Sequence, residues 1–475
     1  MDLRRRPGLR LAGWVVAVAI LAGCSGLPFI GASPSATPLP GREHGSHETL
    51  PPDATPFPDR HSDELELVAS LPKDEHSFDF FNSDLAFWGD TLVQGSYDGF
   101  RLVDISRPTA PRLIADVECR GPQGDVSIWE DLVFVSVDRP QTTPGCDSQD
   151  ADSADPLFVP PEGGWEGIRI FDISLPRRPE LVASVTTDCG SHTNTLVPDL
   201  DNHRLLLYVS SYALAVQPDL APDCTNPHGH ISVVEVPLDD PAAASVIAQP
   251  HLFDTPVWTV WPGAPADFEN TAGCHDISIF EPLHLAAAAC MSEGQIWDIS
   301  DPVRPVQLAH VDLPDVSFWH SAAWSNDGSE VAFGDENLEP AGCTDAPLGS
   351  IWFYDVRDPA APRLDGRFSL DRYQGSEICS AHMFNVIPGI DRDLLVSAFY
   401  AGGTSVIDFT DPTQPQEVAY FDVGGRSPGD EWASYWYRGY IWASDHLRGL
   451  DVFQLNVPDV AGATDLPHLN PQTQE

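Results

Sequence analysis

The chain has 475 residues, of which 71 are acidic and 25 are basic, giving a formal net charge of −46 at pH 7. A field of this sign repels nucleic acid and anionic lipid headgroups, which excludes both as direct partners of the surface. We interpret most of the carboxylates as a solvated face. Four of them form a weaker candidate calcium loop, although their spacing lacks the ordered register of known calcium loops: Asp147, Asp150, Asp152 and Asp155.

Residues 1–23 predict a bacterial lipoprotein signal peptide. Four arginines precede an apolar run from Leu11 to Gly23, which is shorter than the roughly 20 residues that span a bilayer. The run ends in Leu-Ala-Gly-Cys, which resembles a lipoprotein cleavage box, so Cys24 would become the lipidated first residue of the mature chain. A plain secretory signal is the alternative. We expect an extracytoplasmic protein, held at the bacterial cell membrane by its lipid anchor.

Residues 24–62 are rich in Ser, Pro, Gly and Thr and predict a flexible tether. Over residues 63–457, an apolar strand runs seven times into an acidic residue and then a proline-rich turn. These marker acids recur every ~58 residues, against roughly 40–50 in ordinary propeller repeats. We interpret them as turn caps that accept backbone N–H groups: Asp104, Asp172, Glu235, Asp298, Asp355, Asp408 and Asp451. Residues 458–475 are expected to form a disordered tail.

Each repeat contains four short stretches of alternating apolar residues separated by Gly, Pro, Asn or Asp, which is typical of antiparallel strands. One such sheet cannot bury both faces, whereas a closed ring of sheets can. The sequence therefore predicts an all-β fold, a seven-bladed β-propeller with four-stranded antiparallel blades. The segment ELELVASLP from Glu64 matches the last strand of the other repeats, and the seventh repeat ends after its third strand. We expect the N-terminal strand to complete the last blade.

The repeats FRLVDIS at Phe100 and IRIFDIS at Ile168 resemble the LVIVD-repeat family of bacterial and archaeal surface propellers. The resemblance covers roughly residues 64–457. It implies the propeller fold and a surface location, but it implies little about activity, because propellers include both binding scaffolds and enzymes.

Nine cysteines, less the lipidated one, leave an even number in a compartment where disulfides persist. Four of the eight precede an innermost strand, and the other four lie at or in the loop after a second strand. These two connections emerge on the same face of a propeller, so we expect neighbours to pair: Cys119–Cys146, Cys189–Cys224, Cys274–Cys290 and Cys343–Cys379.

The candidate site lies at the first position of the innermost strands. Equivalent positions on successive blades point toward a common axis, so four imidazoles and one carboxylate would converge at one mouth of the central channel. The residues in these positions are Ser83, Gly124, His192, His275, His320, His382 and Glu431. Neutral imidazole binds Zn, Cu, Fe or Ni, and the shortage of charged ligands favours iron or copper over zinc. Glu431 is the candidate catalytic residue, as orienter or proton acceptor.

Alternatives stay open at this point. The four histidines could be structural residues that bond to the loop of the next blade. His228 and His230 form an H-x-H pair whose side chains share one face of an extended strand, and we interpret this pair as incidental. Two functions follow: a lipid-anchored scaffold that binds a surface protein or glycan, or an extracytoplasmic metal-dependent oxidase or oxygenase. We expect a monomer in either case.

Overall fold

The computed structural model describes residues 58–474 with ten internal gaps: 74–80, 153–162, 212–223, 225–227, 253–272, 317, 338–346, 371, 373–379 and 426–428. The predicted signal peptide, Cys24 and nearly all of the predicted tether lie outside the described residues. Within the described ranges, no helix has the length and apolar character needed to cross a bilayer.

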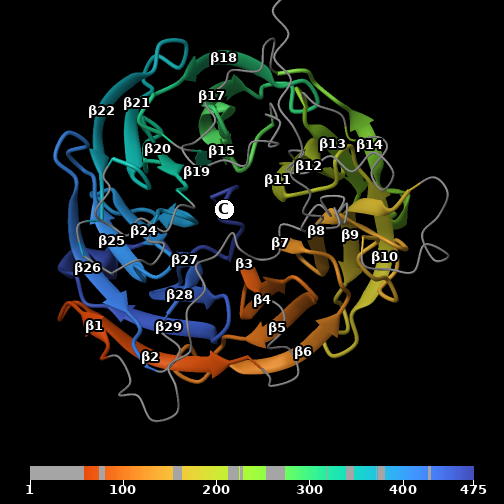
Figure 1. Ribbon diagram of the computed structural model, residues 1–475, viewed down its shortest axis with the longest axis horizontal. Helices are drawn as coiled ribbons and strands as arrows, with labels where there is room; N and C mark the ends of the chain where they lie inside the picture. Colours follow the sequence, from red (N-terminus) through yellow and green to blue (C-terminus); the bar gives the residue numbers. More distant parts are fainter. Residues whose placement is uncertain are drawn as a thin grey trace, which may run out of the picture. The chain divides into compact units, whose positions relative to one another are not determined.

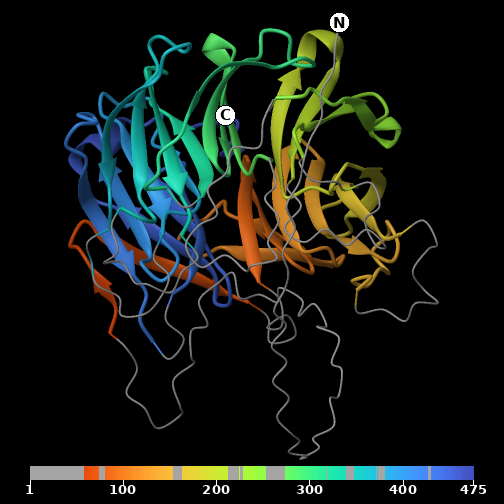
Figure 2. The same cartoon turned by 45° about the horizontal axis from the view of Figure 1, so that its top comes forward.

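Seven antiparallel sheets surround a common axis, which confirms the seven-bladed β-propeller (Figures 1 and 2). From the innermost strand outward, blade 1 consists of β3 (Asn82–Trp88), β4 (Thr91–Ser96), β5 (Gly99–Asp104) and β6 (Arg112–Glu118). Blade 2 consists of β7 (Gln123–Trp129), β8 (Leu132–Gln141), β9 (Trp165–Asp172) and β10 (Glu180–Thr186). Blade 3 consists of β11 (Thr193–Asp199), β12 (Arg204–Ser210), β13 (Ser232–Pro237) and β14 (Ser245–Ala248).

Blades 4 to 6 follow the same order. Blade 4 consists of β15 (Ile277–Phe280), β16 (Leu285–Cys290), β17 (Glu293–Asp298) and β18 (Val306–Val311). Blade 5 consists of β19 (Trp319–Trp324), β20 (Glu330–Asp335), β21 (Ile351–Asp355) and β22 (Arg363–Phe368). Blade 6 consists of β23 (Phe384–Val386), β24 (Leu394–Ala398), β25 (Thr404–Asp408) and β26 (Gln416–Asp422). A short strand, β1 (Arg60–His61), adds to the outer edge of blade 6.

The N-terminal strand closes the ring, as predicted. Blade 7 takes three strands from the end of the repeat region and its outermost strand from the other end of the domain: β27 (Glu431–Tyr437), β28 (Tyr440–Asp445), β29 (Gly449–Leu455) and β2 (Leu65–Pro72). β2 pairs antiparallel with β29 from Leu65 to Pro72, and Figure 1 shows the two side by side in red and blue.

The described part of the chain buries its apolar residues between blades rather than inside one core. Each of seven apolar clusters fills the space between two neighbouring blades, and one of them joins β27 and β28 of blade 7 to β3 and β4 of blade 1. The third and fourth strands of every blade meet with a register shift. Such bulges increase the local twist, which suits sheets that stack around an axis.

Most marker acids cap turns, as predicted. In five repeats the carboxylate Oδ1 accepts the backbone N–H of the residue two positions later, at 2.7 to 3.0 Å. Bonds to the Ser106 hydroxyl and the Arg112 guanidinium hold the pKa of Asp104 low, at about 2. The remaining marker acids make other contacts: Glu235 pairs with Arg204, and Asp451 pairs with Arg448.

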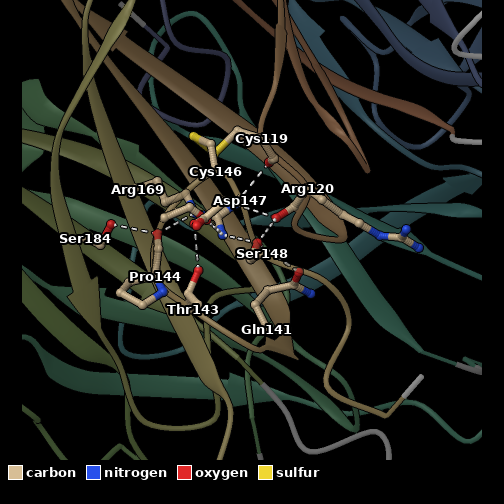
Figure 3. The surroundings of a disulfide bond; sticks show 11 residues. Cys119, Arg120, Gln141, Thr143, Pro144, Cys146, Asp147, Ser148, Arg169 and Ser184 are labelled. Carbon is tan, nitrogen blue, oxygen red and sulfur yellow. Dashed lines mark hydrogen bonds between the residues drawn. A yellow bond between two sulfur atoms is a disulfide. The ribbon is translucent and has the colours of Figure 1, made fainter. Parts of the chain in front are cut away.

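Three of the four expected disulfides are present: Cys119–Cys146, Cys189–Cys224 and Cys274–Cys290. Cys343 and Cys379 lie outside the described residues. Beside the first disulfide, the fully buried Arg169 donates to the carbonyls of Cys119 at 3.0 Å and Pro144 at 3.1 Å (Figure 3). One cation thus binds both segments that the disulfide joins.

The C-terminal segment is ordered through residue 474, which corrects the expected disordered tail. Residues Pro458–Gly462 form a 3-10 helix, and β30 (His468–Leu469) pairs with β3 on its inner side. The chain end therefore lies at the centre of the ring (Figure 1). Polar side chains hold it there: Asn470 bonds to both backbone groups of Ile128, and Gln474 bonds to both of Trp324. These bonds satisfy inner-strand groups that would otherwise need water.

Candidate metal centre on the ring axis

The four predicted histidines lie on consecutive blades, at the beginnings of the innermost strands, as the alignment indicated. Their ring centroids are 4.3 Å apart for His192 and His275, 3.7 Å for His275 and His320, and 4.3 Å for His320 and His382. All four side chains are buried, with exposed fractions of 5% or less. Each imidazole therefore contacts the next along an arc of the ring.

The four do not gather around one point. Among the described residues, the groups at this end of the axis that could hold one ion contain two histidines each: His275 and His320 with Asp276, and His320 and His382 with Glu336. Each group brings its ligand atoms within 4.8 Å of one another. The expected four-histidine site becomes two overlapping three-residue sites, because successive blades are rotated about the axis and only neighbours come close.

Glu336 is the carboxylate that joins the histidines. It follows the last residue of β20, and its oxygens lie 3.6 Å from His320 Nε2 and 3.7 Å from His382 Nε2. Tyr400 donates its hydroxyl hydrogen to Glu336 Oε1. These contacts place one acidic group between two imidazoles in a buried environment.

His382 has a defined orientation. Its Nδ1 lies 2.5 Å from the carbonyl oxygen of Trp432, so Nδ1 carries the hydrogen and Nε2 presents its lone pair toward Glu336. Burial, as the largest cause, lowers the pKa of His382 to about 3. The imidazole is therefore neutral at neutral pH, which is the form that binds metal ions.

His192 and His275 interact with other side chains. His192 Nδ1 lies 2.7 Å from Asp138 Oδ2, and its Nε2 lies 3.0 Å from the amide nitrogen of Gln123. His275 Nδ1 lies 3.1 Å from Asp276 Oδ1, and burial lowers its pKa well below the ordinary value. These two histidines thus extend the buried polar cluster beyond Glu336.

Glu431 does not take the predicted role. The pairing of β27 with β28 shifts register between Glu431 and Ala433, just as β19 with β20 shifts around His320. Trp432 therefore occupies the histidine position, and its ring lies 4.6 Å from that of His382. Among the described residues, the groups that could hold a metal ion with these histidines contain Asp276 or Glu336 and not Glu431. A one-residue bulge turned the carboxylate away from the histidines.

Glu336 was missed because the alignment covered only the innermost strands. Its position directly after the second strand is the position of His446 in blade 7, where Asp445 is followed by His446 as Asp335 is by Glu336. His446 also lies close to this end of the axis, with its ring 5.0 Å from that of Trp432. An alignment of the second strands would have found both residues.

Two of the four candidate calcium aspartates bond to protein groups, and the calcium loop stays a prediction. Asp150 Oδ2 pairs with Arg120 at 2.8 Å, and Asp150 Oδ1 accepts from Gln141. Asp147 Oδ1 accepts the hydroxyl of Thr143. Asp155 lies outside the described residues.

Fold and site together define a seven-bladed β-propeller with a buried cluster of histidines and carboxylates on its axis. No protein-family model matches the chain, and no curated protein matches it. Among solved structures, it is similar to the computationally designed Ika8 protein, with 11% identity and a TM-score of 0.43 over 82% of this chain and 100% of that one. It is also similar to the periplasmic gluconolactonase PpgL of Pseudomonas aeruginosa, with 13% identity and a TM-score of 0.49 over 82% and 99%. At these values neither likeness bears on function.

Proposed function

We propose that this chain is an exported LVIVD-type propeller that binds one transition-metal ion on its axis through His320, His382 and Glu336. The supporting observation is the position of Glu336, 3.6 and 3.7 Å from the two imidazole nitrogens. These separations are too long for hydrogen bonds. They are close to the roughly 3–3.5 Å between two ligands that each bind one ion at about 2.0–2.2 Å.

This ligand set suits oxygen or redox chemistry. Two imidazoles and one carboxylate leave coordination positions open, as in non-haem iron oxygenases. The Tyr400 hydroxyl on Glu336 and the Trp432 carbonyl on His382 would orient the ligands from behind, the usual role of outer partners. The activity we propose is a metal-dependent oxidase or oxygenase, and iron or copper is favoured over zinc because zinc has no redox chemistry.

The second candidate is a binding scaffold without catalysis. It is supported by the disulfides, because Cys189 and Cys274 precede the strands that begin beside His192 and His275. Covalent links of this kind restrict the loops around that end of the axis. The partner would be a surface protein or a glycan, since the net charge of −46 disfavours nucleic acid.

Location and assembly complete the proposal. The disulfides indicate an oxidising, extracytoplasmic compartment. We propose that lipid on Cys24 anchors the protein to the bacterial cell membrane and that the protein is a monomer.

Elemental analysis of the purified full chain tests the metal proposal. After loading with Fe(II) or Cu(II) and dialysis, we expect the His320→Ala/His382→Ala variant to retain at least one ion per chain fewer than the parent. The matched control is His310→Ala, an exposed histidine on β18, which should retain the parental amount. Equal metal content in the double variant and the parent would contradict the metal centre and favour the scaffold.

Glu336→Gln separates metal binding from folding. The amide keeps the shape of the side chain and can accept the Tyr400 hydroxyl, but it removes the charge that a cation requires. We expect affinity for the loaded ion to fall by more than about 10-fold, with little change in the thermal melting temperature of the metal-free protein. Unchanged affinity would exclude Glu336 as a ligand.

A further inference from the structure

A second cluster of metal-binding residue types lies away from Glu336, at blade 3. Asp188 comes directly before Cys189, in the connection from β10 to β11. His228 and His230 follow Cys224 and precede β13. The disulfide Cys189–Cys224 fastens these two segments together, which brings residues about 40 positions apart into contact.

The three side chains converge. His230 Nε2 lies 2.8 Å from Asp188 Oδ2, and the rings of His228 and His230 are 4.3 Å apart. One ligand atom from each residue lies within 4.8 Å of the other two. The backbone at His230 bridges to His251, which supports the extended conformation that keeps both imidazoles on one side.

One carboxylate oxygen of Asp188 lacks a hydrogen-bond partner among the described residues. Its Oδ2 contacts His230, but its Oδ1 is buried and accepts no hydrogen bond from the described residues. A buried acceptor without a partner destabilises the fold, and a bound cation would remove that cost. This oxygen is the second observation, besides the proximity of the histidines, that points to a ligand here.

His228 has the tautomer that a metal requires. The Ser211 hydroxyl donates to the Asp188 carbonyl at 2.9 Å, so its oxygen accepts the N–H of His228 Nε2 at 3.2 Å. Nδ1 then carries a lone pair.

We propose that Asp188, His228 and His230 bind a divalent transition ion, zinc or copper(II), at a site separate from the axial centre. Two imidazoles and one carboxylate are a known protein ligand set for zinc, with a fourth position for water. The side chains of His230 and Asp188 are 24% and 22% exposed, so water can reach them. The ion would reinforce the disulfide in fixing the start of β11, since His192 comes four positions after Asp188. The interpretation of this H-x-H pair as incidental is thereby replaced.

Equilibrium dialysis of the metal-free full chain with Zn²⁺ tests this site. We expect His228→Ala/His230→Ala to bind one zinc fewer than the parent while His310→Ala binds as the parent does. The variant His320→Ala/His382→Ala should keep the zinc that depends on His228 and His230, whether or not it loses one at the axis. The two double variants therefore test the axial site and this site independently of each other. Parental zinc stoichiometry and affinity in His228→Ala/His230→Ala would overturn this inference.

The variant Asp188→Asn tests the same site in a way that does not depend on whether the double variant folds. The amide oxygen can still accept from His230, so the fold is preserved while the negative charge is lost. We expect zinc affinity at this site to fall by more than about 10-fold, with the disulfide Cys189–Cys224 still formed in peptide mass analysis. Unchanged zinc affinity in Asp188→Asn would also overturn the inference.

Discussion

At the scale of single residues, Glu431 shows how burial changes a carboxyl group. It is fully buried, and neither of its oxygens accepts a hydrogen bond from the described residues. Desolvation, followed by repulsion from Asp445 and Asp451, raises its pKa well above the ordinary value of 4.5. The folded state therefore holds a proton that the unfolded chain releases. The stability that this group contributes is fully present below pH 4.5 and is lost as the pH rises toward its raised pKa.

The variant Glu431→Gln lacks this titration. We expect its free energy of unfolding to exceed that of the parent above pH 4.5. The difference should grow by up to about 1.4 kcal/mol per pH unit between pH 4.5 and the raised pKa. Urea unfolding from pH 5 to pH 8 would measure the difference. Glu281→Gln, which removes a carboxyl group from an exposed turn, is the matched control. A constant difference between Glu431→Gln and the parent at every pH would contradict the buried-proton explanation.

The histidines could be predicted because equivalent residues of aligned repeats share one place in a closed ring. Glu336 was missed because it follows a second strand, and the alignment covered only the beginnings of the innermost strands. The sequence did not reveal, for another reason, that Trp432 and not Glu431 occupies the position equivalent to the histidines. A β-bulge adds a residue without changing the alternation of apolar positions on either side, and the sequence EWASYW is compatible with both registers.

At the scale of elements, the C-terminal segment joins the inner strands of five blades. β30 pairs with β3, Asn470 bonds to Ile128, and the hydroxyl of Thr473 donates to Leu196. The carbonyl of Gln472 accepts from Ile279, and Gln474 bonds to Trp324. Since each contact is on a different blade, the segment resists separation of neighbouring blades at the end of the axis opposite the histidines.

Deletion of residues 466–475 tests this role. The amide hydrogens of Ile128, Ile279 and Trp324 bond to the segment in the intact protein, and we expect their exchange with deuterium to accelerate by more than about 10-fold after deletion. Amides of β21 in the same sample serve as the internal control. Asn470→Ala should accelerate Ile128 alone. Equal exchange in the deleted and intact proteins would show that the contacts add no protection.

This element could not be predicted by apolar patterning. The sequence NPQTQ after Leu469 has the composition of a solvated tail, and a polar stretch normally lacks the apolar area needed to offset ordering. Here the amide and hydroxyl side chains pair with backbone groups at the ends of inner strands. Hydrogen bonds therefore stabilise this segment, as the burial of apolar side chains stabilises the blades. The blades themselves were predictable because their apolar alternation repeats seven times.

At the scale of the whole molecule, the excess of acids opposes a structure that the blade interfaces hold together. The formal charge of −46 is carried by a chain whose blades must remain in contact at every interface. Repulsion among like charges destabilises a compact state, and dissolved salt screens it within about 10 Å at 0.1 M ionic strength. Stability of the folded ring should therefore depend on salt.

We expect the thermal melting temperature to rise steadily as NaCl increases from about 10 mM to about 0.5 M, because the screening length falls over this range. Scanning calorimetry at pH 7 would record it. Lowering the pH to 5 at low salt is not an equivalent test, because buried acids such as Glu431 also respond. A melting temperature that falls or stays constant with added NaCl would show that surface repulsion does not limit stability.

The pairing of β2 with β29 has a consequence for the order of synthesis. Only the two-residue β1 leaves the ribosome before β2 among the described strands, yet the partner of β2 is made nearly last. For most of translation the strand LELVASLP therefore lacks its partner strand. An unpaired strand edge is a template for aggregation. Nascent chains of this protein should therefore depend on a holding chaperone until release, and moving β2 to follow β29 by circular permutation should relieve that dependence.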